Sequence, residues 1–395
     1  MNLKFAHLAD CHLGGWRQEE MQELNFLSFQ KAIDICIEER TEFILISGDL
    51  FDSAYPPIEI LKQTFAEFRK IKQANIPVYL IAGSHDFSAS GKTFLDVLEK
   101  AGFCKNVEQR ELQEDGRIKL YPHLHENTAI FGYSGKKSGM EIEDLKKVYF
   151  DSMYPFTIFM IHTTVSDVVG PTLPVESIDK LTLPLADYYA MGHIHKVFEK
   201  QEARSLYVYP GPTFPNNFQE LADLKQGSFQ IIEIQDSKIQ TRNIKIKIKE
   251  TVYTEIQIEN TLTATEKIIQ EIDKQNMNDK IVLMKLTGTI TQGKTGDINF
   301  TEIEEFVKKK QAYSFIRNIS SLKTQESEIE IDISDIENLE EKIIQQYSEQ
   351  NPSDFNKILQ QLINALSIEK NEDEKSTIFE SRLLAEAQKI LNLPL

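Results

Sequence analysis

The chain has 395 residues, 41% hydrophobic and 27% charged, which is typical of a globular protein with two or three domains. The net charge of −17, from 44 basic and 61 acidic residues, argues weakly against nucleic-acid binding without excluding it. No apolar run reaches the about 18 residues of a membrane span, three scattered cysteines predict no disulfide framework, and the start lacks a signal-peptide pattern, so we expect a cytoplasmic protein.

Residues 1–245 alternate apolar strand-like runs with helix-like runs, which predicts an α/β domain. Buried strands are predicted over 3–9, 43–46, 78–82, 128–131, 157–161 and 188–191. Apolar residues at helical spacing predict helices within 24–39 and 58–73. Beyond residue 206 the domain is predicted to be mostly strand.

A small α+β domain is predicted over 250–320, with strands at 251–258 and 280–286. Between these strands Thr263-x-x-Glu266 matches a capping box, and Thr301-x-x-Glu304 predicts the start of a second helix.

A third, helical segment is predicted over 334–395, with Ser334-x-x-Glu337 and Asn351-Pro352 as helix starts. Its helices carry wide apolar stripes, which include Phe355, Leu359, Leu362, Leu366, Phe379 and Leu383. Such stripes need a cover. The helices either pack on their own protein or each other, or dock on a partner.

Five polar clusters each follow a predicted strand. They are Asp-Cys-His at 10–12, Gly-Asp-Leu-Phe-Asp at 48–52, Gly-Ser-His-Asp at 83–86, His162, and Gly-His-Ile-His at 192–195. Ligands of open α/β sheets gather at the carboxyl ends of strands, so we expect the clusters to face one cleft. Residues i and i+2 of an extended chain point the same way, and the glycines permit sharp turns.

Mixed carboxylate and imidazole donors suit Mn²⁺, Fe²⁺ or Zn²⁺ rather than Ca²⁺. One bridging carboxylate, with ligands on either side, would hold two ions about 3.5–4 Å apart, an arrangement that hydrolyses phosphate esters. Other histidines lack this context. His123 and His125 are predicted to be surface or packing residues, and His7 to face away from Asp10.

The order D-x-H, GD-x-x-D, G-x-H-D, H and GHIH resembles the calcineurin-like metallophosphoesterase superfamily. Finer motifs resemble the SbcD family of DNA repair exonucleases: His-Leu-Ala-Asp-Cys-His-Leu-Gly at 7–14, GDLFD at 48–52, and Tyr-Pro-Gly-Pro-Thr at 209–213 with the following Phe-Pro-Asn-Asn-Phe. The resemblance implies a four-layer sandwich of two β-sheets flanked by helices, with a DNA-contacting capping domain over 250–320.

The same resemblance implies Mn²⁺-dependent exonuclease and endonuclease activity on DNA ends, with two Mn²⁺ per subunit. It also implies a homodimer at the nucleoid, whose C-terminal helices bind an SMC-like ABC ATPase of the SbcC type. Carried over by position, it makes Asp10, His12 and His195 ligands of one metal and His162 and His193 ligands of the other, with Asp49 bridging both.

In this resemblance His85 would contact the scissile phosphate or protonate the leaving oxygen, with Asp86 holding its ring. Ser84 stands where superfamily members usually carry Asn. Because a serine hydroxyl is shorter and a poorer donor, Ser84 would bind the second metal through water or not at all. We therefore expect weaker occupancy of the second metal.

Candidate DNA contacts are Trp16, Arg17, Lys136, Lys137, Lys245 and Lys247. The stretch 242–249 alternates basic residues with isoleucine, so its basic side chains are predicted to share one strand face. That face is either a solvated edge strand or a DNA track.

Three functions stay open at this point. The leading one is a DNA nuclease subunit. The second is a metallophosphoesterase for nucleotides or phosphoproteins, which would need neither the domain over 250–320 nor the helical tail. The third is a scaffold that binds DNA and the ATPase with weakened catalysis, which the full set of predicted ligands disfavours.

Overall fold

The computed structural model describes residues 2–324 except 89, 90, 92, 137, 138, 140, 152, 167–176 and 237, and in addition 356–368, 370 and 376–391. The chain forms two compact units, Met1–Lys323 and Thr324–Leu395. Among the described helices, none combines the length and apolar character needed to cross a membrane.

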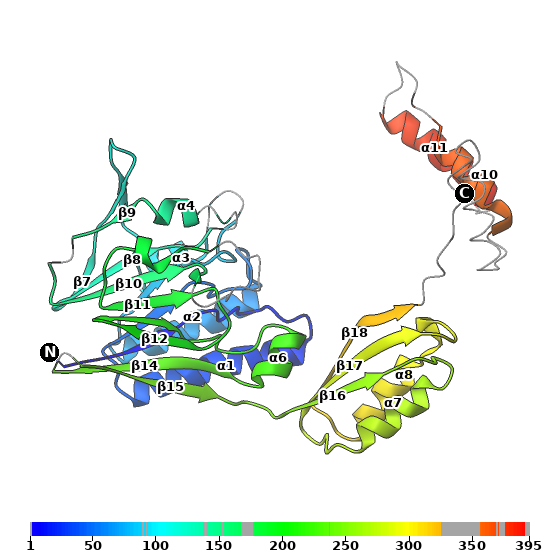
Figure 1. Ribbon diagram of the computed structural model, residues 1–395, viewed down its shortest axis with the longest axis horizontal. Coiled ribbons are helices and arrows are strands. Elements are labelled where there is room, and N and C mark those ends of the chain that lie inside the picture. Colours follow the sequence, from blue (N-terminus) through cyan, green and yellow to red (C-terminus); the bar gives the residue numbers. More distant parts are fainter. Residues whose placement is uncertain are drawn as a thin grey trace. The chain divides into compact units, whose positions relative to one another are not determined.

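The first large sheet has six strands in the order β15-β14-β1-β2-β3-β4. Its strands are β1 (Leu3–Leu8), β2 (Phe43–Ser47), β3 (Val78–Ile81), β4 (Lys105–Asn106), β14 (Gly227–Gln235) and β15 (Lys238–Ile246). The helices α1 (Glu19–Glu38), α2 (Ile58–Gln73) and α3 (Leu95–Lys100) pack on one face of this sheet through a shared apolar core (Figure 1). The strands predicted at 3–9, 43–46 and 78–82 and both predicted helices are confirmed.

The second large sheet has the order β12-β13-β11-β10-β8-β7. Its strands are β7 (His123–His125), β8 (Thr128–Tyr133), β10 (Phe156–His162), β11 (Tyr188–Gly192), β12 (Phe198–Glu202) and β13 (Ser205–Tyr209). Its outer face packs on α4 (Glu141–Leu145) and on a small sheet of β5 (Arg110–Leu112), β6 (Ile118–Leu120) and β9 (Val148–Tyr149). The predicted α/β sandwich is confirmed, with a small sheet supplementing the helical cover on this side.

Aromatic side chains fill the space between the two large sheets. Phe5 stacks on Phe43 with ring centroids 4.9 Å apart, and meets Tyr188 of the other sheet edge-on at 5.3 Å. His7 is buried here and its Nδ1 is hydrogen-bonded to the Tyr188 hydroxyl at 2.9 Å, so it faces away from Asp10 as predicted. This packing brings the carboxyl ends of β1, β2, β10 and β11 to the same edge. For example, His162 at the end of β10 is hydrogen-bonded through Nδ1 to the carbonyl of Ser47 at the end of β2, at 2.9 Å.

Residues 251–324 form a three-stranded sheet in the order β16-β17-β18 with two helices. The elements are β16 (Thr251–Gln257), α7 (Ala264–Asp273), β17 (Ile281–Ile290), η2 (Thr295–Asp297), α8 (Phe300–Lys309) and β18 (Ser314–Thr324). Both predicted helices are present, but neither threonine caps its helix through its side chain. Thr263 makes no side-chain cap because its ψ of 2° is not extended. Asn299, two residues before Thr301, caps α8 instead.

Trp16 lies in an apolar cluster between α1, the segment around α6 (Phe218–Leu224), β17 and β18. The side chain is only 6% exposed, and its Nε1–H donates to the Pro215 carbonyl at 2.9 Å. The prediction that Trp16 reaches DNA is therefore wrong, because its large apolar surface and its one donor are both satisfied inside. The neighbouring Arg17 is exposed.

The second unit contains α10 (Asn356–Leu366) and α11 (Ser376–Leu391), which contact each other. The predicted stripe residues Leu359, Leu362 and Leu366 lie on α10, and Phe379 and Leu383 lie on α11. The predicted helix starts at Ser334 and Asn351-Pro352, and Phe355 with them, lie outside the described residues.

Candidate metal centre

Carboxylates and imidazoles from separate strand ends meet at one edge of the sandwich. Asp10 and His12 follow β1, Asp49 follows β2, His162 ends β10, and His195 follows β11. The described part of the chain contains three sets of residues that could hold a metal ion, and in each set the possible ligand atoms lie within 4.8 Å of one another. The sets are Asp10, His12 and His195; Asp10, Asp49 and His162; and His12, Asp52 and His85. Two of these sets have Asp10 in common and two have His12.

Asp49 lies between the two groups of ligands. Its Oδ2 is 3.2 Å from His162 Nε2 and 3.7 Å from His12 Nε2. Asp10 is also shared, since its Oδ1 is 3.7 Å from His195 Nε2 and 4.0 Å from His162 Nδ1. Both carboxylates can therefore contribute to two adjacent cation positions.

The centre contains polar atoms that a cation would satisfy. Asp10 Oδ2 is buried and has no hydrogen-bond partner among the described residues. Buried polar atoms in folded proteins almost always have a partner. The Nε2 atoms of His12 and His195 are only 3.2 Å apart. Both Nε2 atoms face the same point, so this donor set fits bound divalent cations.

Four residues of the predicted clusters have left-handed backbone conformations. The φ angles are 52° at Asp10, 43° at His12, 50° at Asp49 and 94° at His193. Non-glycine residues adopt positive φ uncommonly, at a cost of about 1–3 kcal/mol each where the region is sparsely populated. The concentration of these conformations at three strand ends, those of β1, β2 and β11, indicates that the backbone is strained where it directs side chains into the centre.

The glycines of the motifs are needed mainly because other groups approach them closely. A Cβ atom added at Gly48 would lie 2.2 Å from His162 Nδ1, and one at Gly192 would lie 2.0 Å from the Ser47 carbonyl oxygen. A Cβ at Gly83 would lie 2.1 Å from Asp49 Oδ1. Of the three, only Gly48 has a positive φ, so the predicted role in turns applies to it alone.

We expect Gly83→Ala to displace the Asp49 carboxylate, because no real Cβ tolerates a contact of 2.1 Å. Metal affinity measured by calorimetry should fall at least ~10-fold, the size of effect seen when a ligand's support is disturbed. Gly296→Ala is the control, since a Cβ there meets nothing within 4 Å. Equal Mn²⁺ affinity in both variants would contradict this reading.

Three of the four predicted ligand histidines have their outer ring nitrogen held by an oxygen atom. The Nδ1–H group of His162 donates to the Ser47 carbonyl at 2.9 Å. That of His12 donates to Asp52 Oδ1 at 3.1 Å, and that of His195 donates to Glu220 Oε1 at 3.0 Å. These contacts fix the tautomer and leave Nε2 facing the centre. Sequence reasoning did not assign Asp52 or Glu220. Asp52 ends the GDLFD motif, whereas Asn217-x-x-Glu220 is a helix-start pattern that does not point to a metal centre.

Charge in the centre is set by burial and by the close carboxylates. Burial disfavours ionised Asp49, but His162 and His12 hold the pKa of its carboxyl below the usual range. Burial also opposes a charged His162, yet Asp49 and Asp10 raise its pKa to about 10. For His195, burial is outweighed by Glu220 and Asp10, which raise the pKa to about 8. The centre therefore attracts positive charge.

The partner of His85 is Asp52, not Asp86. His85 Nδ1–H donates to the Asp52 carbonyl at 2.8 Å and lies 3.8 Å from Asp52 Oδ1. Asp86 is buried and accepts from the backbone N–H groups of Leu50, Phe51 and Gly83. Burial, and then the charge of Asp49, raise the pKa of Asp86 to about 7. The prediction that Asp86 holds the His85 ring is wrong, because adjacent residues of the turn point apart and Asp86 instead fastens the turn.

His193 and Ser84 are not in the three sets found in the described residues. The His193 ring centroid lies 5.3 Å from that of His162, and its backbone N–H donates to Asp10 Oδ1 at 2.9 Å. Burial lowers the pKa of His193 to about 4, which keeps the imidazole neutral and available as a ligand. Ser84 is half-buried in the turn before His85.

The lysines that are predicted to contact DNA differ in whether they already form ion pairs within the protein. Lys136 pairs with Asp144, and Lys247 pairs with Glu250 at 3.0 Å. Lys245 is exposed on β15 and lines a cavity of about 210 Å³ together with His195. The predicted shared face is shorter than expected, because β15 ends at Ile246, before Lys247. Lys137 lies outside the described residues.

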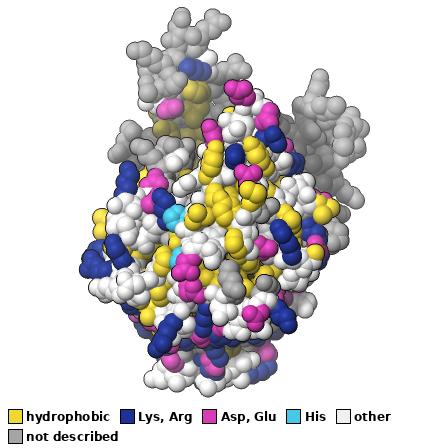
Figure 2. All heavy atoms as spheres, turned by 90° about the vertical axis from the view of Figure 1, so that its left-hand side faces the viewer, with side chains coloured by type: hydrophobic (Ala, Val, Ile, Leu, Met, Phe, Trp, Pro, Cys, Tyr) yellow, Lys and Arg dark blue, Asp and Glu magenta, His cyan; other side chains and the backbone are white. Residues whose placement is uncertain are grey.

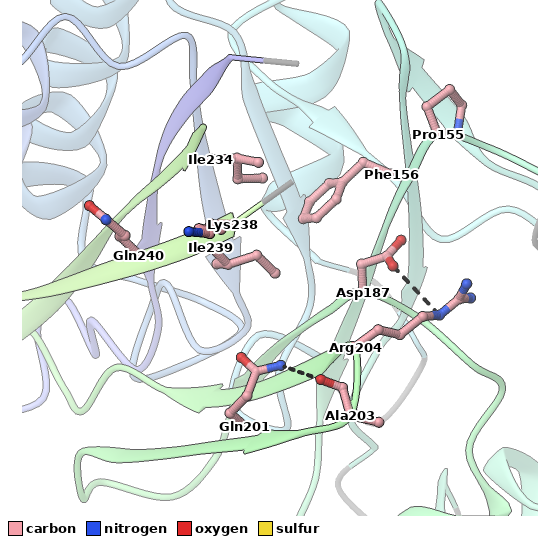
Figure 3. A pocket seen from close by; sticks show the side chains of 10 residues that line it. All are labelled: Pro155, Phe156, Asp187, Gln201, Ala203, Arg204, Ile234, Lys238, Ile239 and Gln240. Carbon is pink, nitrogen blue, oxygen red and sulfur yellow. Dashed lines mark hydrogen bonds and ion pairs between the residues drawn. The ribbon is translucent and has the colours of Figure 1, made fainter. Parts of the chain in front are cut away.

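At the opposite ends of the strands, the described residues form no comparable group of possible metal ligands. A cavity of about 550 Å³ lies there, between the start of β10, the β12–β13 turn and the β14–β15 turn (Figure 3). Its Arg204 Nε is 3.7 Å from Asp187 Oδ1. Among the described side chains on the face drawn in Figure 2, basic and acidic groups are interspersed, with no broad basic area. This face does not look like a DNA track.

Several known proteins are similar to this chain in sequence. The sequence profile of the calcineurin-like phosphoesterases matches residues 3–197. The chain is 32% identical over 274 residues to the DNA double-strand break repair protein Mre11 of Methanococcus maripaludis, covering 62% of this chain and 70% of that protein. The Mre11 protein of Methanocaldococcus jannaschii is 26% identical (67% and 72% covered). That of Sulfolobus acidocaldarius is 26% identical, with 81% and 84% covered.

Proposed function

The chain belongs to the Mre11 family of calcineurin-like phosphoesterases, and we propose that it hydrolyses phosphodiester bonds at DNA ends with two Mn²⁺ ions during double-strand break repair. The observation that supports this most is the pair of adjacent ligand groups joined by Asp10 and Asp49. A centre of this kind suits phosphate esters.

In this proposal Asp10, His12 and His195 hold one ion, and His162 and His193 hold the other, with Asp49 between them. Ser84 reaches the second ion only through water or not at all, so that ion is the weaker of the two. When bound, the two ions would supply an activated water and polarise the phosphoryl oxygens.

His85 is proposed to meet the substrate directly. Its Nδ1–H is engaged by the Asp52 carbonyl, so the opposite nitrogen, Nε2, is the one available to the scissile phosphate. The residue is exposed, as a group that contacts substrate must be. From this position His85 would donate a proton to the leaving oxygen or hydrogen-bond a non-bridging oxygen.

The remaining parts of the chain would serve DNA and partners. We propose that the module over 250–320 contacts DNA, together with Arg17 and Lys245, which are exposed. The segment over 334–395 would bind an SMC-like ABC ATPase of the SbcC type. In its described part, Leu366 and Leu384 are 48% and 59% exposed, which leaves apolar surface for a partner. A homodimer acting at the nucleoid completes the proposal.

Substrate choice tests the function. Purified protein should degrade linear duplex DNA in Mn²⁺, and activity should vanish with EDTA and return on adding Mn²⁺. Hydrolysis of p-nitrophenyl phosphate, a monoester, should be far slower. Efficient monoester hydrolysis without DNA cleavage would instead indicate a phosphatase of nucleotides or phosphoproteins. DNA binding without any cleavage would indicate a scaffold.

A further inference from the structure

The segment between β13 and α6 is fastened to the domain through its carbonyl groups. Ser228 holds two of them, with Oγ donating to the Pro210 carbonyl at 2.6 Å and N–H to that of Pro212 at 2.9 Å. Trp16 Nε1–H holds the carbonyl of Pro215 at 2.9 Å. Proline has a fixed φ and no N–H to satisfy, so three prolines that are held by their carbonyls make this segment stiff. It ends immediately before Asn216.

Two consecutive asparagines then aim Glu220 at the metal centre. Asn217 caps α6 by accepting from the Glu220 N–H at 3.0 Å. The Glu220 side chain turns back, so that Oε2 accepts from the Asn216 N–H at 2.9 Å. The other oxygen, Oε1, lies 3.0 Å from His195 Nδ1. Glu220 thus connects a helix start to a proposed ligand.

Asn216 connects the same segment to the second supporting carboxylate. Its Nδ2 donates to Asp52 Oδ1 at 3.2 Å, and Asp52 Oδ1 in turn accepts from His12 Nδ1 at 3.1 Å. The fit leaves no spare room, since a Cβ added at Gly15 would lie 2.4 Å from Asn216 Oδ1 and 2.9 Å from Asp52 Oδ1. One short segment therefore positions both carboxylates, Glu220 and Asp52, that hold the outer nitrogens of His195 and His12.

We propose that Glu220 is a positioning residue of the metal centre: it holds the His195 ring with Nε2 toward the ion, and through Asn216 it fixes Asp52, which does the same for His12. This inference rests on the proposed metal-dependent function. It assigns a role to residues beyond the 3–197 stretch that the family profile matches. Carboxylates behind metal-bound histidines fix the tautomer and raise the basicity of the ligand.

The test is Mn²⁺ binding by the full chain without DNA. We expect Glu220→Gln, which keeps the shape but removes the charge, to weaken Mn²⁺ about 10–100-fold in calorimetry, as loss of such partners typically does. In DNA cleavage the Mn²⁺ concentration for half-maximal rate should rise by the same factor, while the rate at saturating Mn²⁺ is retained. A residue needed only for folding would instead lower the melting temperature and leave the affinity of the folded fraction unchanged.

Asp223→Asn is the matched control, because it lies on the same helix and its carboxylate accepts from Gln219 at 2.9 Å. This variant should bind Mn²⁺ like the natural protein. Asn216→Ser, which removes the donor to Asp52, should weaken Mn²⁺ in the same direction as Glu220→Gln. Unchanged Mn²⁺ affinity in folded Glu220→Gln and Asn216→Ser overturns the positioning role. Absence of Mn²⁺ binding by the natural protein overturns the proposed function itself.

Discussion

Asp49→Asn is expected to abolish Mn²⁺ binding while the protein stays folded. The amide oxygen can still accept from the His85 N–H, as Asp49 Oδ1 does at 2.8 Å. The amide nitrogen, however, would replace Oδ2, the atom placed 3.2 Å from His162 Nε2 and 3.7 Å from His12 Nε2. The centre would lose a negative charge and its shared ligand together.

Cleavage of linear DNA by Asp49→Asn should fall by about 10³-fold or more, since the metals are expected to contribute several kcal/mol to transition-state stabilisation. Thermal unfolding without added metal should show a melting temperature close to that of the natural protein. Asp34→Asn is the control, because Asp34 forms only a surface pair with Lys70. Mn²⁺-dependent cleavage by Asp49→Asn at the natural rate would rule out Asp49 as a shared ligand.

His85→Ala is expected to separate catalysis from metal binding. The ring is held by the Asp52 carbonyl and lies beside His12, with centroids 4.8 Å apart, so it borders the ligands without having to be one. Loss of a general acid typically costs 10²–10⁴-fold. We therefore expect the single-turnover cleavage rate to fall by about 10²-fold or more, with calorimetric Mn²⁺ affinity unchanged.

His125→Ala is the matched control for the loss of an imidazole. His125 packs edge-on against Phe43 with ring centroids 4.8 Å apart and is hydrogen-bonded to the Tyr79 hydroxyl at 3.0 Å. Phe43 begins β2, whereas Asp49 of the centre follows the other end of that strand. It should affect stability rather than cleavage by the folded protein. If His85→Ala instead lost Mn²⁺ affinity in proportion to its rate, His85 would be a ligand and not a group that acts on the substrate.

The sequence by itself predicted the α/β fold and the edge of the sheets at which the candidate ligands meet. Strands such as β1 and β10 are buried on both faces, so they read as continuous apolar runs, and polar residues directly after them mark strand ends. Because parallel strands present their carboxyl ends at one edge, the sequence predicts that Asp10, Asp49 and His162 lie close together.

Only the tertiary structure decided which groups stand behind the ligands. Glu220 meets His195, and Asn216 meets Asp52, across long stretches of chain, and no local pattern encodes such a contact. The sequence also does not show where a side chain points within a tight turn. Asp86 adjoins His85, yet its carboxylate accepts from backbone N–H groups instead of contacting the His85 ring. Trp16 turned inward because burying its indole surface outweighs exposure, and that depends on an apolar cluster assembled from distant segments.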